Sequence, residues 1–153
     1  MRLPACGLYR TSVSIGSIPP ERLVFFHNHG NPGPGVYLPE SWSQNRAVFS
    51  ERGVTLDDET LAATLEPLLD EGLYVVEETF TCCDERCVTY EKDQLVQLGY
   101  DQKAQPILFR PTWTRRGLSI PEIGQPTELG RLDGLRAVFV DEAEDDADPE
   151  LLH

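Results

Sequence analysis

The sequence LVQLGYDQKAQPILF, residues 95–109, decides the fold of this chain. Two apolar runs, residues 95–100 and 106–109, flank the polar segment 101–105. Two runs of strand-forming residues on either side of a short polar segment are typical of an antiparallel β-hairpin. We therefore predict that these residues form a hairpin around which a sheet is built.

Other apolar or alternating runs predict further strands, because branched and aromatic side chains favour extended backbone. The predicted strands are residues 7–15, 22–27, 36–38, 46–49, 72–81, 88–90 and 135–140. The chain also has 12 glycines and 12 prolines, and residues 111–126 are expected to form a loop. The predicted fold class is mainly β (α+β), as a single small antiparallel barrel, partly open, or a sandwich. The order of the strands does not follow from the sequence.

One short helix is predicted to pack across the sheet, beginning near Asp57. Asp57 can cap its first turn, and Leu61 and Leu65 lie four residues apart on one face. Pro67 ends this helix because a proline ring clashes with the preceding turn. A further helical turn over residues 127–132 is expected before the last strand.

The chain has 153 residues, which is enough for one domain with a hydrophobic core. We predict one globular domain over residues 1–140. Residues 141–153 carry seven acidic side chains, and up to Glu150 they contain no apolar residue larger than alanine. Such a segment cannot offset its ordering entropy by burial, so residues 141–153 are predicted to be a disordered acidic tail.

The net charge of −13 is unevenly distributed. Residues 57–93 carry twelve acidic and two basic side chains, whereas residues 1–56 and 94–140 are each slightly basic. A strongly acidic centre disfavours nucleic acid and anionic membranes, since phosphate contacts need cations, and it favours another protein as the partner. No apolar run has the length of a membrane span or of a secretory leader. We therefore expect a cytoplasmic protein with reduced thiols.

Three of the four cysteines, Cys82, Cys83 and Cys87, are clustered, and His27 and His29 form a His-x-His pair. Thiolates and imidazoles are ligands that zinc prefers. If residues 73–82 and 87–91 are the arms of a hairpin, Cys82 and Cys87 flank its four-residue tip. If Cys82 and Cys83 are both in a strand, they point to opposite faces. Cys87, one more thiol and both histidines would then complete a tetrahedral zinc site. The alternatives for the thiols are a disulfide, a redox switch and reduced packing in the core.

The sequence contains no familiar catalytic motif. It lacks the Gly-x-Ser-x-Gly elbow of α/β-hydrolases, and Gly30, Gly33 and Gly35 lack the Lys-Ser/Thr of a phosphate-binding loop. A nucleophilic pair of Cys83 with His27 would need a third, orienting group that the sequence does not identify. These observations favour a protein that is not an enzyme.

Aromatic and arginine side chains form a candidate recognition surface. Tyr37 and Trp42 lie close to the proline- and glycine-rich loop, and Trp113 lies beside Arg115 and Arg116. These residue types dominate the binding energy of protein interfaces, whereas core packing is the alternative for the aromatic members. We predict that these five residues contact a partner protein.

Three functional hypotheses follow. The first is a non-enzymatic cytoplasmic protein-interaction module with a strongly acidic surface and no cofactor. The alternative is a zinc-binding protein with a structural or small hydrolytic site made of the His-x-His pair and the clustered cysteines. The third is a thiol redox sensor. The identity of the partner, any substrate and the oligomeric state do not follow from the sequence.

Overall fold

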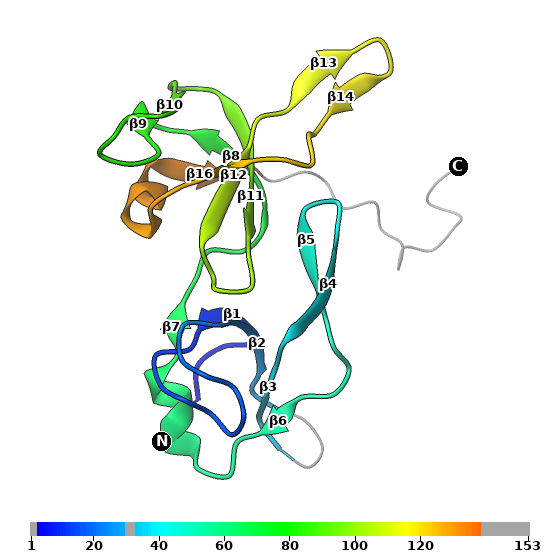
Figure 1. Ribbon diagram of the computed structural model, residues 1–153, viewed down its shortest axis with the longest axis vertical. Helices are drawn as coiled ribbons and strands as arrows, with labels where there is room; N and C mark the ends of the chain where they lie inside the picture. Colours follow the sequence, from blue (N-terminus) through cyan, green and yellow to red (C-terminus); the bar gives the residue numbers. More distant parts are fainter. Residues whose placement is uncertain (1–2, 30–32, 139–153) are drawn as a thin grey trace.

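The computed structural model describes residues 3–29 and 33–138, so the predicted acidic tail lies outside the described residues. Over these residues the fold is mainly β, with two five-stranded antiparallel sheets, three two-stranded hairpins and two 3-10 helices (Figure 1). The predicted fold class is confirmed. Neither of the described sheets closes into a barrel, because the outermost strands of each do not pair with one another.

The N-terminal sheet has the strand order β6-β3-β2-β1-β7. Its strands are β1 (Gly7–Arg10), β2 (Leu23–His27), β3 (Gly35–Tyr37), β6 (Val54–Thr55) and β7 (Glu66–Pro67). β1 and β2 are antiparallel, with Gly7 opposite Phe26. One hydrophobic cluster, in which Val24, Phe26 and Val36 are fully buried, belongs to this sheet.

The C-terminal sheet has the strand order β15-β12-β11-β8-β16. Its strands are β8 (Gly72–Val76), β11 (Leu95–Tyr100), β12 (Pro106–Phe109), β15 (Gln125–Pro126) and β16 (Leu135–Ala137). The predicted central hairpin is β11–β12, with Gln97 opposite Phe109, and its prediction is confirmed. A second cluster, which includes the fully buried Val96 and Leu98, packs on this sheet.

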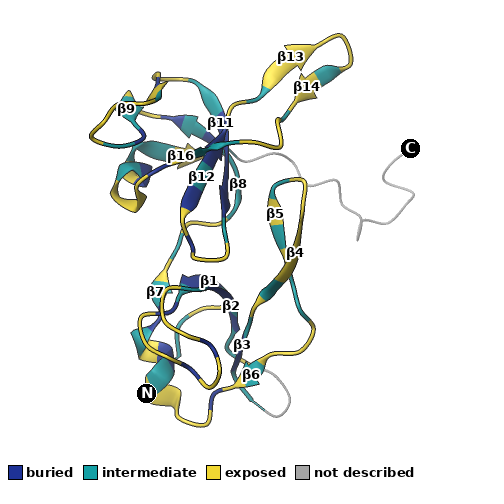
Figure 2. Ribbon diagram, viewed as in Figure 1, coloured by how far each residue is buried: buried dark blue, intermediate teal, exposed yellow. Residues whose placement is uncertain are grey.

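Three hairpins complete the sheet structure of the described residues. They are β4 (Pro39–Ser43) with β5 (Arg46–Phe49), β9 (Phe80–Thr81) with β10 (Thr89–Tyr90), and β13 (Thr112–Thr114) with β14 (Gly117–Ser119). The predicted strand over residues 72–81 is divided between β8 and β9. The expectation of a loop over residues 111–126 is wrong, since this segment contains β13, β14 and β15. Figure 2 shows that β13 and β14 are mostly exposed, so no buried apolar stripe marks them in the sequence.

The two helices of the described residues are short 3-10 helices, η1 (Glu59–Thr64) and η2 (Leu129–Gly134). η1 is the predicted helix, but its N-cap is Asp58 and not Asp57. Hydrogen bonds from the Thr60 side chain and backbone to the Asp58 carboxylate lower the pKa of Asp58. η2 corresponds to the expected helical turn and begins two residues later.

The β4–β5 hairpin links the N-terminal sheet to the C-terminal sheet. Its turn residues Gln44 and Asn45 have positive φ angles of 52° and 66°, as a type I′ turn requires. Asn45 Nδ2 donates hydrogen bonds to Gln97 Oε1 (2.9 Å) and to the Pro121 carbonyl oxygen (2.8 Å). Gln97 Nε2 in turn donates to the Gln44 carbonyl oxygen (3.1 Å), so the turn satisfies a buried amide of β11.

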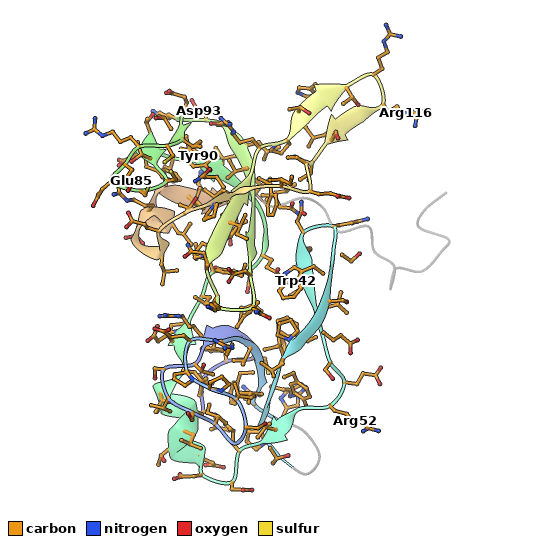
Figure 3. All side chains as sticks on the ribbon, viewed as in Figure 1. Trp42, Arg52, Glu85, Tyr90, Asp93 and Arg116 are labelled. Atoms are coloured by element: carbon orange, nitrogen blue, oxygen red, sulfur yellow. The ribbon has the colours of Figure 1, made fainter. Side chains whose placement is uncertain are left out.

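The backbone of β11 lies close to this turn. A Cβ atom at Gly99 would be 2.6 Å from the Asn45 carbonyl oxygen, so only glycine fits there without a shift. One residue further, the indole N–H of Trp42 donates to the Tyr100 carbonyl oxygen (2.8 Å); Trp42 is labelled in Figure 3. The hairpin is therefore held on β11 by both its turn and its first strand.

Variants of Asn45 separate the turn conformation from the side-chain hydrogen bonds. Asn45→Gly retains a residue that accepts positive φ but loses two hydrogen bonds, and it should lower the free energy of unfolding by about 1–2 kcal/mol. Asn45→Ala also strains the left-handed backbone and should cost about 1 kcal/mol more. Urea denaturation measures both values. Wild-type stability in both variants would contradict the role of this turn as a link.

Glu71 provides a further contact to the β4–β5 hairpin, and its carboxylate is half-buried. Oε2 accepts the Ala47 N–H (2.9 Å). Burial raises the pKa of Glu71, while this hydrogen bond and the nearby Arg46 act in the opposite direction and Asp70 adds to the rise. A carboxyl whose pKa is higher in the folded state contributes stability at acidic pH, and that contribution is lost as the pH rises through the folded-state pKa.

The variant Glu71→Gln tests this sign. Because glutamine cannot ionise, the variant should gain stability relative to the wild type as the pH rises from about 4 to about 7. Thermal unfolding midpoints of both proteins across this range give the difference. A difference that stays constant with pH, or that changes in favour of the wild type, would show that burial does not disfavour the Glu71 carboxylate.

Candidate metal centres

The loop that joins β9 to β10 carries the three clustered cysteines; we call it the thiol loop, residues 82–88 (Figure 1). The β9–β10 ladder places Thr81 opposite Thr89. The Cys82 N–H continues the ladder with a hydrogen bond to the Val88 carbonyl oxygen (3.0 Å). The hairpin therefore extends one pair into the loop before the chain turns.

Cys83 and Cys87 are the next facing positions of this ladder. Arg86 has a φ of 55°, and its N–H donates to the Cys83 carbonyl oxygen (3.0 Å), which closes the turn. This is the three-residue type of hairpin turn, in which the residue before the second strand is left-handed. Because the turn spans three residues, Cys83 and Cys87 flank the tip. The prediction that Cys82 and Cys87 flank it is therefore wrong by one position.

The three sulfur atoms of the thiol loop converge. The Sγ atoms of Cys82, Cys83 and Cys87 all lie within 4.8 Å of one another, and those of Cys82 and Cys83 are 3.5 Å apart. A tetrahedral site with Zn–S bonds of about 2.3 Å places its sulfurs about 3.8 Å apart. The expectation that Cys82 and Cys83 point to opposite faces required both to lie in a strand, and the regular strand ends at Thr81. We call this group of thiols, which could hold a metal ion, the thiol centre.

Hydrogen-bond donors surround the sulfur atoms of the thiol centre. The Cys87 backbone N–H and, next, the Cys82 thiol lower the pKa of Cys83. The pKa of Cys87 is raised, because its thiol donates a hydrogen bond to the Cys83 sulfur and because negative charge on Cys83 disfavours a second thiolate. The Val88 N–H donates to Cys82 Sγ (3.3 Å). Such contacts orient metal-binding thiolates and stabilise their charge.

Helix η2 holds the thiol loop in place. The Glu128 N–H donates to the Cys82 carbonyl oxygen (2.9 Å). The Arg131 guanidinium forms ion pairs with the carboxylates of Asp84 and Glu128. Asp84 is therefore engaged by an arginine, although it lies next to a potential metal ligand in the sequence. Figure 3 shows Glu85 at the outer edge of the same loop.

A second group joins both histidines to Cys6, a residue that belongs to none of the predicted sites. Because Gly7 lies opposite Phe26, the β1–β2 register places Cys6 across from His27. The ligand atoms of Cys6, His27 and His29 all lie within 4.8 Å of one another. We call this group the histidine centre. Knowledge of the register between the first two predicted strands would have identified Cys6, because the residue before the first strand lies opposite the last residue of the second.

The histidine centre lies at the surface. Cys6 and His29 are exposed and His27 is half-buried. The two imidazole rings meet edge to face with centroids 4.2 Å apart. The backbone N–H of His29 donates a hydrogen bond to His27 Nδ1 (3.2 Å). The two side chains are thus held together on one face, as their spacing predicts.

The two centres lie in different halves of the described structure. The histidine centre is at the end of β2 in the N-terminal sheet, whereas the thiol loop lies beside the C-terminal sheet at the other end of the molecule (Figure 1). The predicted single tetrahedral site, which combined His27 and His29 with the clustered thiols, is therefore not formed. The pairing of Cys83 with His27 is likewise excluded by this separation.

The residues predicted to contact a partner are divided among β3, β4 and the β13–β14 hairpin. Trp113, Arg115 and Arg116 lie on the β13–β14 hairpin, where Trp113 is 82% exposed. Trp42 lies in the link between the sheets and is 41% exposed, and Tyr37 is half-buried in β3. Only the hairpin members stand clear of the rest of the described structure.

Comparison with known proteins identifies no family. No protein-family model, curated protein or solved structure matches this chain. Among the helices of the described residues, none has the length and apolar composition needed to cross a bilayer. A functional proposal therefore depends on the geometry of the two centres and of the surface.

Proposed function

We propose that the protein binds zinc at the thiol centre. The observation that supports this is the convergence of three thiols on a loop whose backbone N–H groups already point at their sulfurs. Zinc in structural sites is most often held by cysteine thiolates. The thiol with the lowered pKa, Cys83, would lose its proton first and provide the initial ligand.

Water or another ligand from solution would occupy the fourth coordination position. Asp84 is ion-paired with Arg131, so its carboxylate would have to give up that contact in order to bind zinc. Three thiolates give the zinc complex a net negative charge. The Arg131 guanidinium, held at the edge of the loop, offsets part of this charge.

The proposed role of zinc is to stabilise the β9–β10 hairpin. This hairpin pairs only two residues from each strand within the described part of the chain, and Asp84, Glu85, Arg86 and Cys87 are exposed. A metal ion that binds the folded loop and not the unfolded chain adds its binding free energy to the stability of the fold. Zinc would thereby fix the thiol loop against η2.

Zinc content and cobalt spectra test this proposal. Protein purified without chelators should contain zinc, and Cys87→Ser should lose the equivalent bound at the thiol centre, because removing a thiolate leaves two cysteine ligands there. With Co²⁺ as a probe, the wild type should show the charge-transfer absorption of cobalt–thiolate bonds, and Cys87→Ser should lose most of it. Elemental analysis and absorption spectroscopy measure the two quantities.

Cys6→Ser is the matched control, since it removes an exposed cysteine outside the thiol centre. It should retain the zinc of the thiol centre and most of the charge-transfer absorption. Circular dichroism checks that each variant is folded. Absence of zinc from the wild type, together with the absence of a cobalt–thiolate band, would refute the proposal. It would leave the redox sensor, which predicts a fall in free thiols after mild peroxide treatment.

A second proposal is that the protein acts as a non-enzymatic interaction module, and the β13–β14 hairpin supports it. Residues 110–121 contain Arg110, Arg115 and Arg116 and no acidic residue, in a chain of net charge −13. Trp113 is exposed on the same hairpin. A basic segment with a solvent-exposed tryptophan is suited to an acidic surface of a partner protein.

Charge reversal on this hairpin tests the interaction. The double variant R115E/R116E should abolish retention of an acidic partner in pull-down experiments, and the wild-type complex should weaken as salt is added. Arg136→Glu is the control, because Arg136 is exposed on β16 and lies outside the hairpin. Equal retention by R115E/R116E and the wild type would contradict the assignment of the hairpin as the contact surface.

A further inference from the structure

The histidine centre has the donor set of a metal site that is chemically different from the thiol centre. It combines one thiol, Cys6, with two imidazoles, His27 and His29. Tetrahedral zinc with Zn–S of about 2.3 Å and Zn–N of about 2.0 Å places sulfur and nitrogen ligands about 3.5 Å apart. Cys6 Sγ and His29 Nδ1 are 4.0 Å apart, so a movement of about half an ångström brings them to the distance that such a site requires.

Asn28 positions the side chains of this centre. Its backbone N–H donates to Cys6 Sγ (3.3 Å), and its Oδ1 lies 2.6 Å from His29 Nδ1. Its Nδ2 donates to the Pro4 carbonyl oxygen (3.1 Å), which fixes the amide in place. The Asn28 N–H can remain on a metal-bound thiolate, as outer-shell donors commonly do.

The same contacts argue against a thiol–imidazole catalytic pair. In such a pair, one ring nitrogen faces the thiol and the other is held by an orienting group. Here Asn28 Oδ1 and Cys6 Sγ both face Nδ1 of His29, so the orienting group and the thiol compete for one nitrogen. A metal ion bound by Nδ1 would replace the contact of this nitrogen with Asn28 Oδ1.

Burial and charge indicate which ligand the fourth coordination position of a metal ion at the histidine centre would accept. Cys6 and His29 are exposed, so solvent reaches the centre. Sites with three protein ligands keep a position for water or an added ligand. Residues 22–38 contain no acidic side chain, and Zn²⁺ with one thiolate and two neutral imidazoles retains a net positive charge. A small anion would therefore bind at the open position more readily than at the negatively charged thiol centre.

We propose that Cys6, His27 and His29 bind a second zinc ion whose fourth coordination position is open to small anions from solution. This site would differ from the thiol centre in its single thiolate, its positive charge and its exposure. It does not depend on zinc binding at the thiol centre, because the two centres share no residue.

Cobalt titration of the full chain tests this second site, with azide as the probe anion. The wild type should bind a further equivalent of Co²⁺ after the thiol centre is filled, and azide should change the visible d–d bands of that second cobalt only. Cys6→Ser and His29→Ala should each abolish the azide-sensitive spectrum.

His153→Ala is the matched control, because it removes the remaining histidine of the chain and should leave the azide response unchanged. Persistence of that response in Cys6→Ser or in His29→Ala would overturn the proposal, and so would a wild type that never responds to azide. Cys87→Ser distinguishes the two centres, since it should lose most of the cobalt–thiolate absorption and keep the azide response. Urea unfolding confirms that each variant is folded.

Discussion

The side-chain amide of Gln97 is a buried polar group whose hydrogen bonds hold the β4–β5 hairpin, and with it the N-terminal sheet, on the C-terminal sheet. Gln97 is almost fully buried in the central strand β11, where an unpaired amide would cost about 1–3 kcal/mol. The turn of the β4–β5 hairpin provides its partners, through the Asn45 side chain and the Gln44 carbonyl oxygen. Because β4 and β5 follow directly from the N-terminal sheet, satisfying this amide also brings the two sheets together.

Most strands that carry apolar side chains could be predicted from the sequence, whereas the exposed hairpin β13–β14 could not. β11 and β12 were predicted with their observed bounds, because both strands are apolar and a short polar segment separates them. β13 and β14 were missed, since an exposed hairpin shows no apolar alternation. β4 was missed because it begins at Pro39, and a proline at the first position of a strand resembles a break in the sequence.

Most residues of the two centres could be predicted from the sequence, but which of them lie close to one another could not. Clustering in the sequence was enough to find the thiols, and spacing was enough to find the two histidines. Which histidine meets which cysteine depends on strand register and on the distance between two sheets, and neither follows from local sequence. Cys6 shows this most clearly, because only its position opposite His27 in the β1–β2 ladder connects it to a site.

The thiol loop is joined to the last strand of the described chain through η2. The Glu128 N–H binds the Cys82 carbonyl oxygen, and η2 leads directly into β16, the edge strand beside β8. Edge segments with few buried contacts open more readily than central strands. Metal binding at the thiol centre would thus lower the frequency with which β16 detaches. Amide hydrogen exchange along this strand would then report, from a distance, whether the thiol centre holds a metal ion.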